Sequence, residues 1–240
     1  MKLLVKLNSM IILGIETATM TGGVALLNEQ RLVSEYTLNV STTHTARLMP
    51  AIDLILRDSS VEKQDINGIA ISMGPGSFTG LRIGMATAKG LALGLDVPLL
   101  GVPTLDALAR NIPFSMYPIC TVLDAKKKEV YASLFQYEDD VLVRQMPYQV
   151  MPPADLVNQI HEKTIFLGDA LDAYRDFISE NLGELAIFAP NSQRLPRAAI
   201  VAEIGLSKLK AGEHLDIASA EPIYIRPSDA EISLKAKQKK

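Results

Sequence analysis

The stretch SMGPGSFTGLRIGMATAKGLALGL, residues 72–95, decides how the rest of this chain can fold. It begins as the end of an apolar strand and continues as a helix. Between the two, GPGS at residues 74–77 combines glycine, which tolerates positive φ, with proline, which fixes its own φ, and so predicts a tight turn. The hydroxyl of Ser77 or Thr79 is suited to cap the helix. Strand, glycine-rich turn and helix in this order indicate an α/β fold.

The predicted helix carries small residues one turn apart, at Gly80, Gly84 and Ala88. Each interior glycine costs about 1 kcal/mol relative to alanine, so this repetition needs a reason. A smooth face of small residues lets another backbone approach closely, either within the chain or from a partner. We predict a partner interface on this face, and the family resemblance given below implies that Leu48 and Ile52, on a helix expected at residues 43–57, belong to the same interface.

The same turn does not match the known phosphate-binding loops. Counted from Gly74, both a Walker loop and a GxGxxG fingerprint require glycine where this chain has Thr79. The glycines of the turn are therefore better explained by close packing than by phosphate binding.

Composition narrows the class of protein further. With 240 residues and 48% apolar content, the chain can bury one large core or the cores of two lobes. A net charge of −3 argues against nucleic-acid binding by a basic surface of its own. One cysteine, Cys120, excludes a disulfide framework. No run of 18 apolar residues and no signal peptide is present, so no membrane contact and a cytoplasmic location are expected.

Periodicity predicts the order βββαβα twice in tandem. We expect an N-terminal lobe at residues 10–111 and a C-terminal lobe at 112–226, whose last helix, 196–210, could pack back on the first lobe. The flanking residues, a leader at 1–9 and a lysine-rich tail at 227–240, are expected to be flexible. The third strand of the second lobe is predicted at 141–150.

Six blocks carry a resemblance to a known family. They are IETAT at 15–19, GPGSFTGLRIG at 74–84, KGLALGL at 89–95, GVPTLDALA at 101–109, DAKKKEVYA at 124–132 and AEPIYIR at 220–226. Together they resemble the TsaB (YeaZ) family, within the actin, sugar kinase and Hsp70 ATPase superfamily (ASKHA, ribonuclease H-like). The resemblance covers nearly everything from Met10 to Arg226, and it implies a fold of two tandem α/β lobes.

The resemblance also implies a function. TsaB-like proteins are non-catalytic dimerisation subunits of the tRNA N6-adenosine(37) threonylcarbamoyltransferase complex, and they activate a TsaD-type catalytic subunit. The implied partners are that TsaD-type paralogue, a TsaE-type ATPase and, through the complex, tRNA. ATP and a metal ion are then expected in partner subunits. A homodimer is expected when the chain is alone, because paralogous partners present related surfaces.

Only fragments of a nucleotide site are recognisable. The candidate vestigial turn consists of Glu16, Thr17, Thr19, Gly74, Gly76 and Ser77. Glu16 stands where the superfamily has Asp, and the turn at 124–129 lacks the glycine that would let a backbone approach phosphate. TsaD-like relatives carry His-x-x-x-His, whereas His44 is followed four positions later by Leu48.

We therefore expect no catalytic residue, no metal site and no cofactor in this chain. A small-molecule kinase or ATPase of the same superfamily is the alternative, motivated by the duplicated lobes and the hydroxyls beside Glu16. A peptidase lacks support, because paired metal ligands are missing and Cys120 is expected in a strand core.

Overall fold

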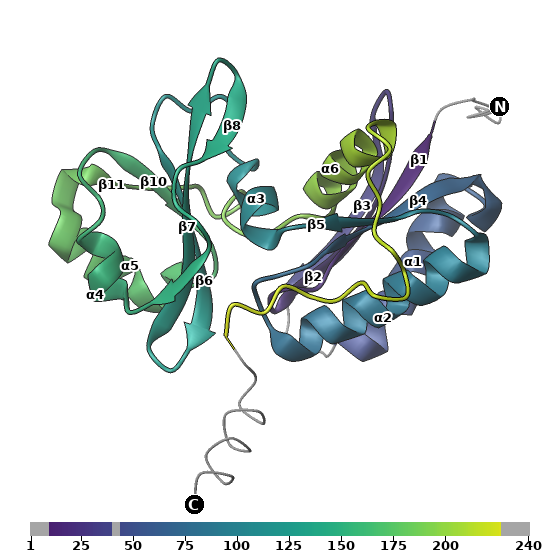
Figure 1. The fold of residues 1–240 in the computed structure, drawn as a ribbon, viewed down its shortest axis with the longest axis horizontal. Helices are drawn as coiled ribbons and strands as arrows, with labels where there is room; N and C mark the ends of the chain where they lie inside the picture. The colour runs from purple at the N-terminus through teal and green to yellow at the C-terminus, as the bar shows by residue number, and fades with distance from the viewer. Residues whose placement is uncertain (1–9, 40–43, 227–240) are drawn as a thin grey trace, which may run out of the picture.

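A computed structural model describes residues 10–39 and 44–226, which form two lobes, each built around one β-sheet (Figure 1). The expectations for the leader at 1–9 and the tail at 227–240 lie outside the described residues.

The first lobe has a five-stranded sheet in the order β3-β2-β1-β4-β5. Its strands are β1 (Ile11–Glu16), β2 (Thr21–Asn28), β3 (Leu32–Asn39), β4 (Ile66–Ser72) and β5 (Leu99–Val102). The first three form an antiparallel meander, and β4 and β5 join parallel to β1. Every residue of β1 is buried, because helices cover both faces of the sheet, and this explains its continuous apolar run.

Helices α1 (His44–Ser59) and α2 (Phe78–Leu95) cover one face of this sheet. Helix α6 (Ala198–Lys210) covers the opposite face, as Figure 1 shows. Its contact with the sheet is close: a Cβ atom added to Gly14 of β1 would lie 2.4 Å from the carbonyl oxygen of Ala198. Alanine on the helix and glycine on the strand make this approach possible.

The second lobe repeats the topology of the first. Its sheet has the order β11-β10-β6-β7-β8, with β9 also paired to β7. The strands are β6 (Ile119–Lys126), β7 (Glu129–Glu138), β8 (Val141–Arg144), β9 (Gln149–Met151), β10 (Thr164–Leu167) and β11 (Ala186–Phe188). Helices α4 (Pro153–Val157) and α5 (Leu171–Leu182) cover one face, and α3 (Thr104–Ala109), which follows β5, packs on the other. The duplicated α/β architecture is confirmed.

Two boundaries differ from the prediction. The strand expected at 141–150 is split into β8 and β9, since Pro147 has no N–H for the ladder and the chain turns away around it. The second sheet ends with β11, and α6 packs on the first lobe, the alternative already expected for the helix at 196–210. The segment up to Tyr224 also lies on the first lobe, so the second lobe ends with its sheet and not at 226.

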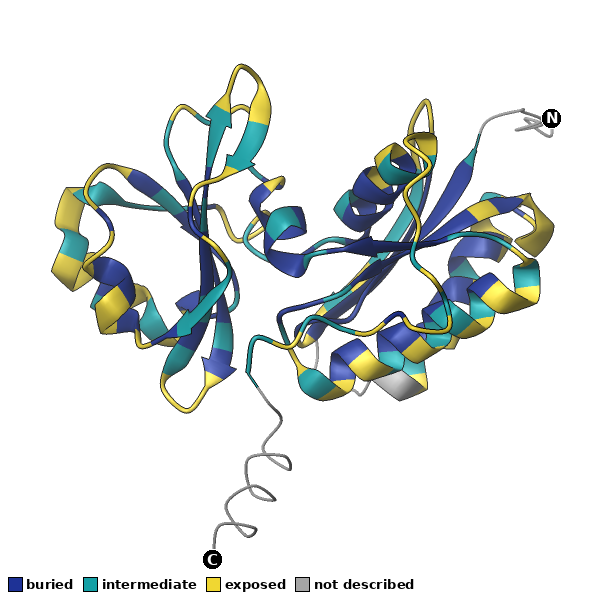
Figure 2. Cartoon of the chain, viewed as in Figure 1, coloured by how far each residue is buried: buried dark blue, intermediate teal, exposed yellow. Residues whose placement is uncertain are grey.

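Residues 213–224 run over the first lobe with one turn at 217–219. The N–H of Leu215 donates to the carbonyl of Leu99 at 2.8 Å, and the N–H of Ile223 donates to the carbonyl of Met73 at 2.7 Å. Figure 2 shows buried strands in the middle of both lobes and exposed residues on the outer sides of the helices. Within the described ranges, no helix is long and apolar enough to cross a membrane.

Candidate functional site

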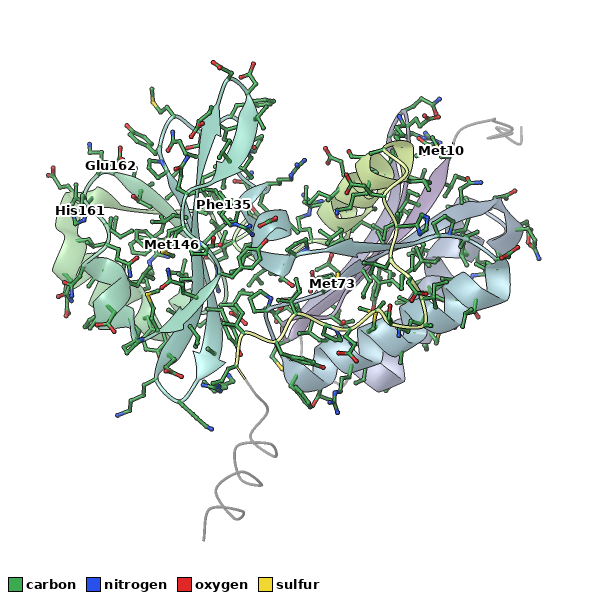
Figure 3. The ribbon with its side chains drawn as sticks, viewed as in Figure 1. Met10, Met73, Phe135, Met146, His161 and Glu162 are labelled. Carbon is green, nitrogen blue, oxygen red and sulfur yellow. The ribbon has the colours of Figure 1, made fainter. Side chains whose placement is uncertain are left out.

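A cleft of about 420 Å³ lies between the lobes, where the β1–β2 hairpin faces the β6–β7 hairpin. Figure 3 shows Met73 on the first-lobe side of this junction and Phe135 and Met146 within the second lobe. The cleft is lined by Ala18, Thr19, Met20 and residues 76–79 of the first lobe, by residues 123–126, Tyr131 and Asp169 of the second, and by Ile223, Tyr224 and Arg226.

The structure separates the six residues predicted for the vestigial nucleotide turn. Half of them line the cleft, namely Thr19, Gly76 and Ser77. The other half, Glu16, Thr17 and Gly74, lie behind its wall, with Glu16 and Thr17 completely buried. Only Thr19, Gly76 and Ser77 of the predicted set can therefore touch a molecule in the cleft.

The glycine-rich turn packs directly on the β1–β2 hairpin. A Cβ atom added to Gly76 would lie 2.3 Å from the carbonyl oxygen of Ala18. The same carbonyl accepts the N–H of Ser77 at 2.6 Å. The Ser77 hydroxyl in turn accepts the N–H of Gly80 at 3.3 Å, which confirms the predicted helix cap. Contact within the chain therefore accounts for glycine at position 76.

Glu16 stabilises the β1–β2 hairpin of which it is part. Its Oε1 accepts the N–H of Ala18 at 2.6 Å, closing the turn after β1. Complete burial raises the pKa of Glu16 from 4.5 to about 7, and the N–H of Ala18 offsets this only in part. The carboxyl group therefore keeps its proton to a higher pH than an exposed glutamate does, and it does not line the cleft.

Asp169 is the functional candidate that the sequence analysis missed. It follows β10 and precedes α5, and its Oδ1 accepts the N–H of Asp124 at 2.9 Å. Burial raises the pKa of Asp169 to about 6. The only local signal is the pair Gly168-Asp169 between a strand and a helix. Gly168 has φ of +132°, and an added Cβ would lie 1.7 Å from the carbonyl oxygen of Val122.

The charged turn after β6 neutralises itself. Lys126 Nζ lies 2.6 Å from Oδ2 of Asp124, and Arg226 Nη1 lies 2.7 Å from Oε2 of Glu129. Both cations that line the cleft are thus paired with carboxylates of the second lobe. Across residues 10–39 and 44–226, no three His, Cys, Asp or Glu side chains gather as a metal site would require.

The five residues predicted for a partner interface lie in the core of the first lobe. Ala88 is completely buried, Leu48 and Ile52 are at most 5% exposed, and Gly80 and Gly84 are buried on the same side of α2. This placement corrects the expectation that they form an outer surface. The physical reason is the close crossing of α2 over the sheet, where a Cβ atom on Gly84 would meet Oγ1 of Thr17 at 2.1 Å.

Substitution of Glu16 by glutamine should flatten the dependence of stability on pH. The folded protein retains the Glu16 proton up to about pH 7, whereas the unfolded chain releases it near 4.5. Between these values the folded state binds more protons, so the free energy of unfolding falls as pH rises. Asp169 contributes with the same sign up to about pH 6. Glu16→Gln keeps a side-chain oxygen that can accept the N–H of Ala18. It removes the contribution of Glu16 to the fall in the free energy of unfolding with rising pH.

Urea unfolding at pH 5 and pH 8 measures this effect. We expect Glu16→Gln to gain roughly 1 to 3 kcal/mol over the wild type at pH 8 and much less at pH 5. Equal effects at both pH values would mean that Glu16 does not titrate within this range.

Comparison with known proteins places this geometry in a family. A family model described as "TsaD: tRNA N6-adenosine threonylcarbamoyltransferase" matches residues 34–234. The chain is 35% identical over 225 residues to the tRNA threonylcarbamoyladenosine biosynthesis protein TsaB of Bacillus subtilis, covering 92% of this chain and 96% of that protein. It is 30% identical to TsaB of Escherichia coli, covering 95% of this chain and 99% of the relative. The chain belongs to the TsaB family.

Structural comparison agrees with the TsaB assignment. The structure of YeaZ from Pseudomonas aeruginosa superposes with a TM-score of 0.73 at 23% identity, covering 90% of this chain and 99% of the other. The expected ASKHA, ribonuclease H-like fold is confirmed, and so is the resemblance to the TsaB (YeaZ) family.

Proposed function

We propose that this TsaB-family chain takes part in tRNA threonylcarbamoyladenosine biosynthesis as a non-catalytic subunit that dimerises with, and activates, a TsaD-type catalytic subunit. The relatives named for this pathway align with nearly the whole chain, including both lobes and the cleft between them. In this proposal tRNA and a TsaE-type ATPase meet the chain only within the complex, and ATP and a metal ion are used by the partner subunits.

The self-neutralised cleft is the observation that carries the non-catalytic part. Catalysis of group transfer needs polar groups aimed at the reacting atoms. Here Glu16 is turned into its own hairpin, Lys126 pairs with Asp124, and Arg226 pairs with Glu129. These groups are engaged by neighbours in the chain, which supports a scaffold whose chemistry is supplied elsewhere.

The outer faces of α1 and α2 are the proposed partner surface. Met49 on α1 is 46% exposed and Leu93 on α2 is 66% exposed. Cβ atoms added to Gly90 or Gly94 would meet nothing within 4 Å, so this side of α2 is smooth and open. A partner with the same fold can present a matching helix pair, and a second copy of this chain can do so when the partner is absent.

Two experiments test the proposal. The first is a pull-down with a tagged TsaD-type subunit, and the second is an assay of tRNA modification in a strain depleted of the native protein. Wild-type chain should copurify and restore modification. The double variant Met49→Glu and Leu93→Glu should lose both, because two charges would be buried unpaired at the seam. Phe114→Glu is the matched control, since Phe114 is 72% exposed on the second-lobe side of the molecule.

The outcomes distinguish the proposed function from the proposed position of the partner surface. A wild-type chain that neither copurifies nor restores modification would contradict the proposed function. A double variant that behaves as the wild type would leave the function standing and place the partner surface away from α1 and α2.

A small-molecule kinase or ATPase is the second candidate, favoured by the cleft itself and by the hydroxyls of Thr19 and Ser77 on its wall. The isolated protein should show no ATP turnover if it is a scaffold. Robust turnover by the isolated wild-type protein would favour the enzyme instead.

A further inference from the structure

We infer that the last described residues, 221–226, form an interlobe strap that holds the two lobes at a fixed separation. The strap is covalently part of the segment that runs over the first lobe, and it ends in contacts with the second. This inference does not depend on the proposed function, since it concerns the isolated chain.

On the first-lobe side the strap is attached by backbone and aromatic contacts. The N–H of Ile223 donates to the carbonyl of Met73 at 2.7 Å. The ring of Tyr224 packs on the ring of Phe78, with 5.1 Å between centroids, and its hydroxyl accepts the Nε–H of Arg82 at 3.2 Å. Residues 223–224 are thus fixed to the end of β4 and the start of α2.

On the second-lobe side the strap ends in one guanidinium group with two acceptors. Arg226 Nη1 donates to Oε2 of Glu129 at 2.7 Å, and Nη2 donates to the carbonyl of Ala125 at 2.9 Å. Both acceptors belong to the β6–β7 hairpin. Because a planar guanidinium holds two acceptors in a fixed geometry, this contact restricts direction as well as distance. The Arg226 side chain is only 20% exposed, which limits screening by solvent.

The other connection between the lobes lies around α3. This helix packs into the core of the second lobe, and Oδ1 of Asp106 accepts the hydroxyl of Tyr148 at 2.7 Å. The two chain crossings meet nearby, where Asn111 Nδ2 donates to the carbonyls of Gln193 and Leu195 at 2.7 and 2.8 Å. In Figure 1, α3 and the end of the strap lie at opposite edges of the junction.

Two connections at opposite edges have a mechanical consequence. With α3 alone, the lobes could bend about a hinge that lies beside it, and the cleft would open or close. The strap bridges the cleft on the far side from that hinge, so it opposes the bending motion directly. The chain itself, instead of a bound molecule, then sets the width of the cleft.

Electron spin resonance distance measurements can test the strap. Spin labels at Ala86→Cys on α2 and Glu162→Cys at the outer edge of the second lobe (Figure 3) report the separation of the lobes, and both positions are exposed. The native Cys120 is completely buried and its thiol pKa is raised by burial, so it should not react with the label.

The doubly labelled wild type should give one narrow distance distribution. Arg226→Ala should broaden it and shift it, because the link to the β6–β7 hairpin is lost. Glu129→Gln, which removes one charge from the other lobe and leaves the strap sequence intact, should produce a smaller change in the same direction. Lys210→Ala is the matched control, since Lys210 pairs with Glu29 at 2.9 Å within the first lobe.

Distributions that stay narrow and unshifted in both Arg226→Ala and Glu129→Gln would overturn the inference. So would an equal broadening in Lys210→Ala, because the effect would then follow from any lost ion pair. Circular dichroism melting of each variant establishes that the labelled proteins are folded. If Arg226→Ala does not fold, Glu129→Gln still tests the strap.

Discussion

Gly84→Leu is expected to lower the melting temperature of the isolated protein sharply. At this position α2 lies so close to the sheet that an added Cβ would sit 2.1 Å from Oγ1 of Thr17 and 3.0 Å from Cδ1 of Ile71. Both neighbours are completely buried and cannot move into solvent. Overpacking of this kind typically costs 1 to 3 kcal/mol, and we expect about 3 kcal/mol or more here. Thermal unfolding followed by circular dichroism measures the effect.

Gly90→Leu is the matched control on the same helix. Nothing lies within 4 Å of a Cβ atom added to Gly90, so leucine there should raise helix propensity without overpacking. A stabilisation of up to about 1 kcal/mol is expected. If Gly84→Leu melted like Gly90→Leu, the close seating of α2 on the sheet would be contradicted.

Gly168→Ala should have an even larger effect, on the second lobe. The residue has φ of +132°, a region that side-chain-bearing residues rarely adopt, and its added Cβ would lie 1.7 Å from the carbonyl oxygen of Val122. Neither β6 nor the loop that carries Asp169 can stay in place around a methyl group. We expect a loss of roughly 4 kcal/mol or more in the free energy of unfolding, measured by urea titration.

Gly212→Ala separates backbone strain from steric collision. Gly212 also has positive φ, +74°, but a Cβ atom there would meet nothing within 4 Å. Its substitution should cost only about 1 to 2 kcal/mol, the strain of the left-handed conformation alone. Equal losses in Gly168→Ala and Gly212→Ala would show that the contact with Val122 does not limit the fold.

Much of the fold could be predicted because its signals are local. The apolar run of β1 and the change from strand to helix around residues 72–78 gave the correct element types. The third strand of the second lobe was predicted as one strand because strand-forming residues stand on both sides of Pro147, which separates β8 from β9. The order of apolar and polar residues does not show whether a strand continues past a proline.

The candidate site was harder to predict because it depends on contacts between distant residues. Periodicity showed that α2 has a small-residue face, but it does not tell whether a sheet or a partner covers that face. Asp169 meets Asp124 only after two strands become neighbours, 45 positions apart. Arg226 reaches Glu129 across 97 positions. No local spacing rule records such pairings.

The return of α6 to the first lobe has a consequence for the order of folding during translation. All strands from β6 to β11 leave the ribosome before α6, so the whole sheet of the second lobe is synthesised before the helix that completes the first lobe. The alanine-lined face of the opening sheet, at Ala25 and Ala70, meanwhile waits for the cover that α6 provides. The lobe synthesised first is thus the last to be completed, because residues 198–210 must return to β1, β2 and β4 across a long sequence separation.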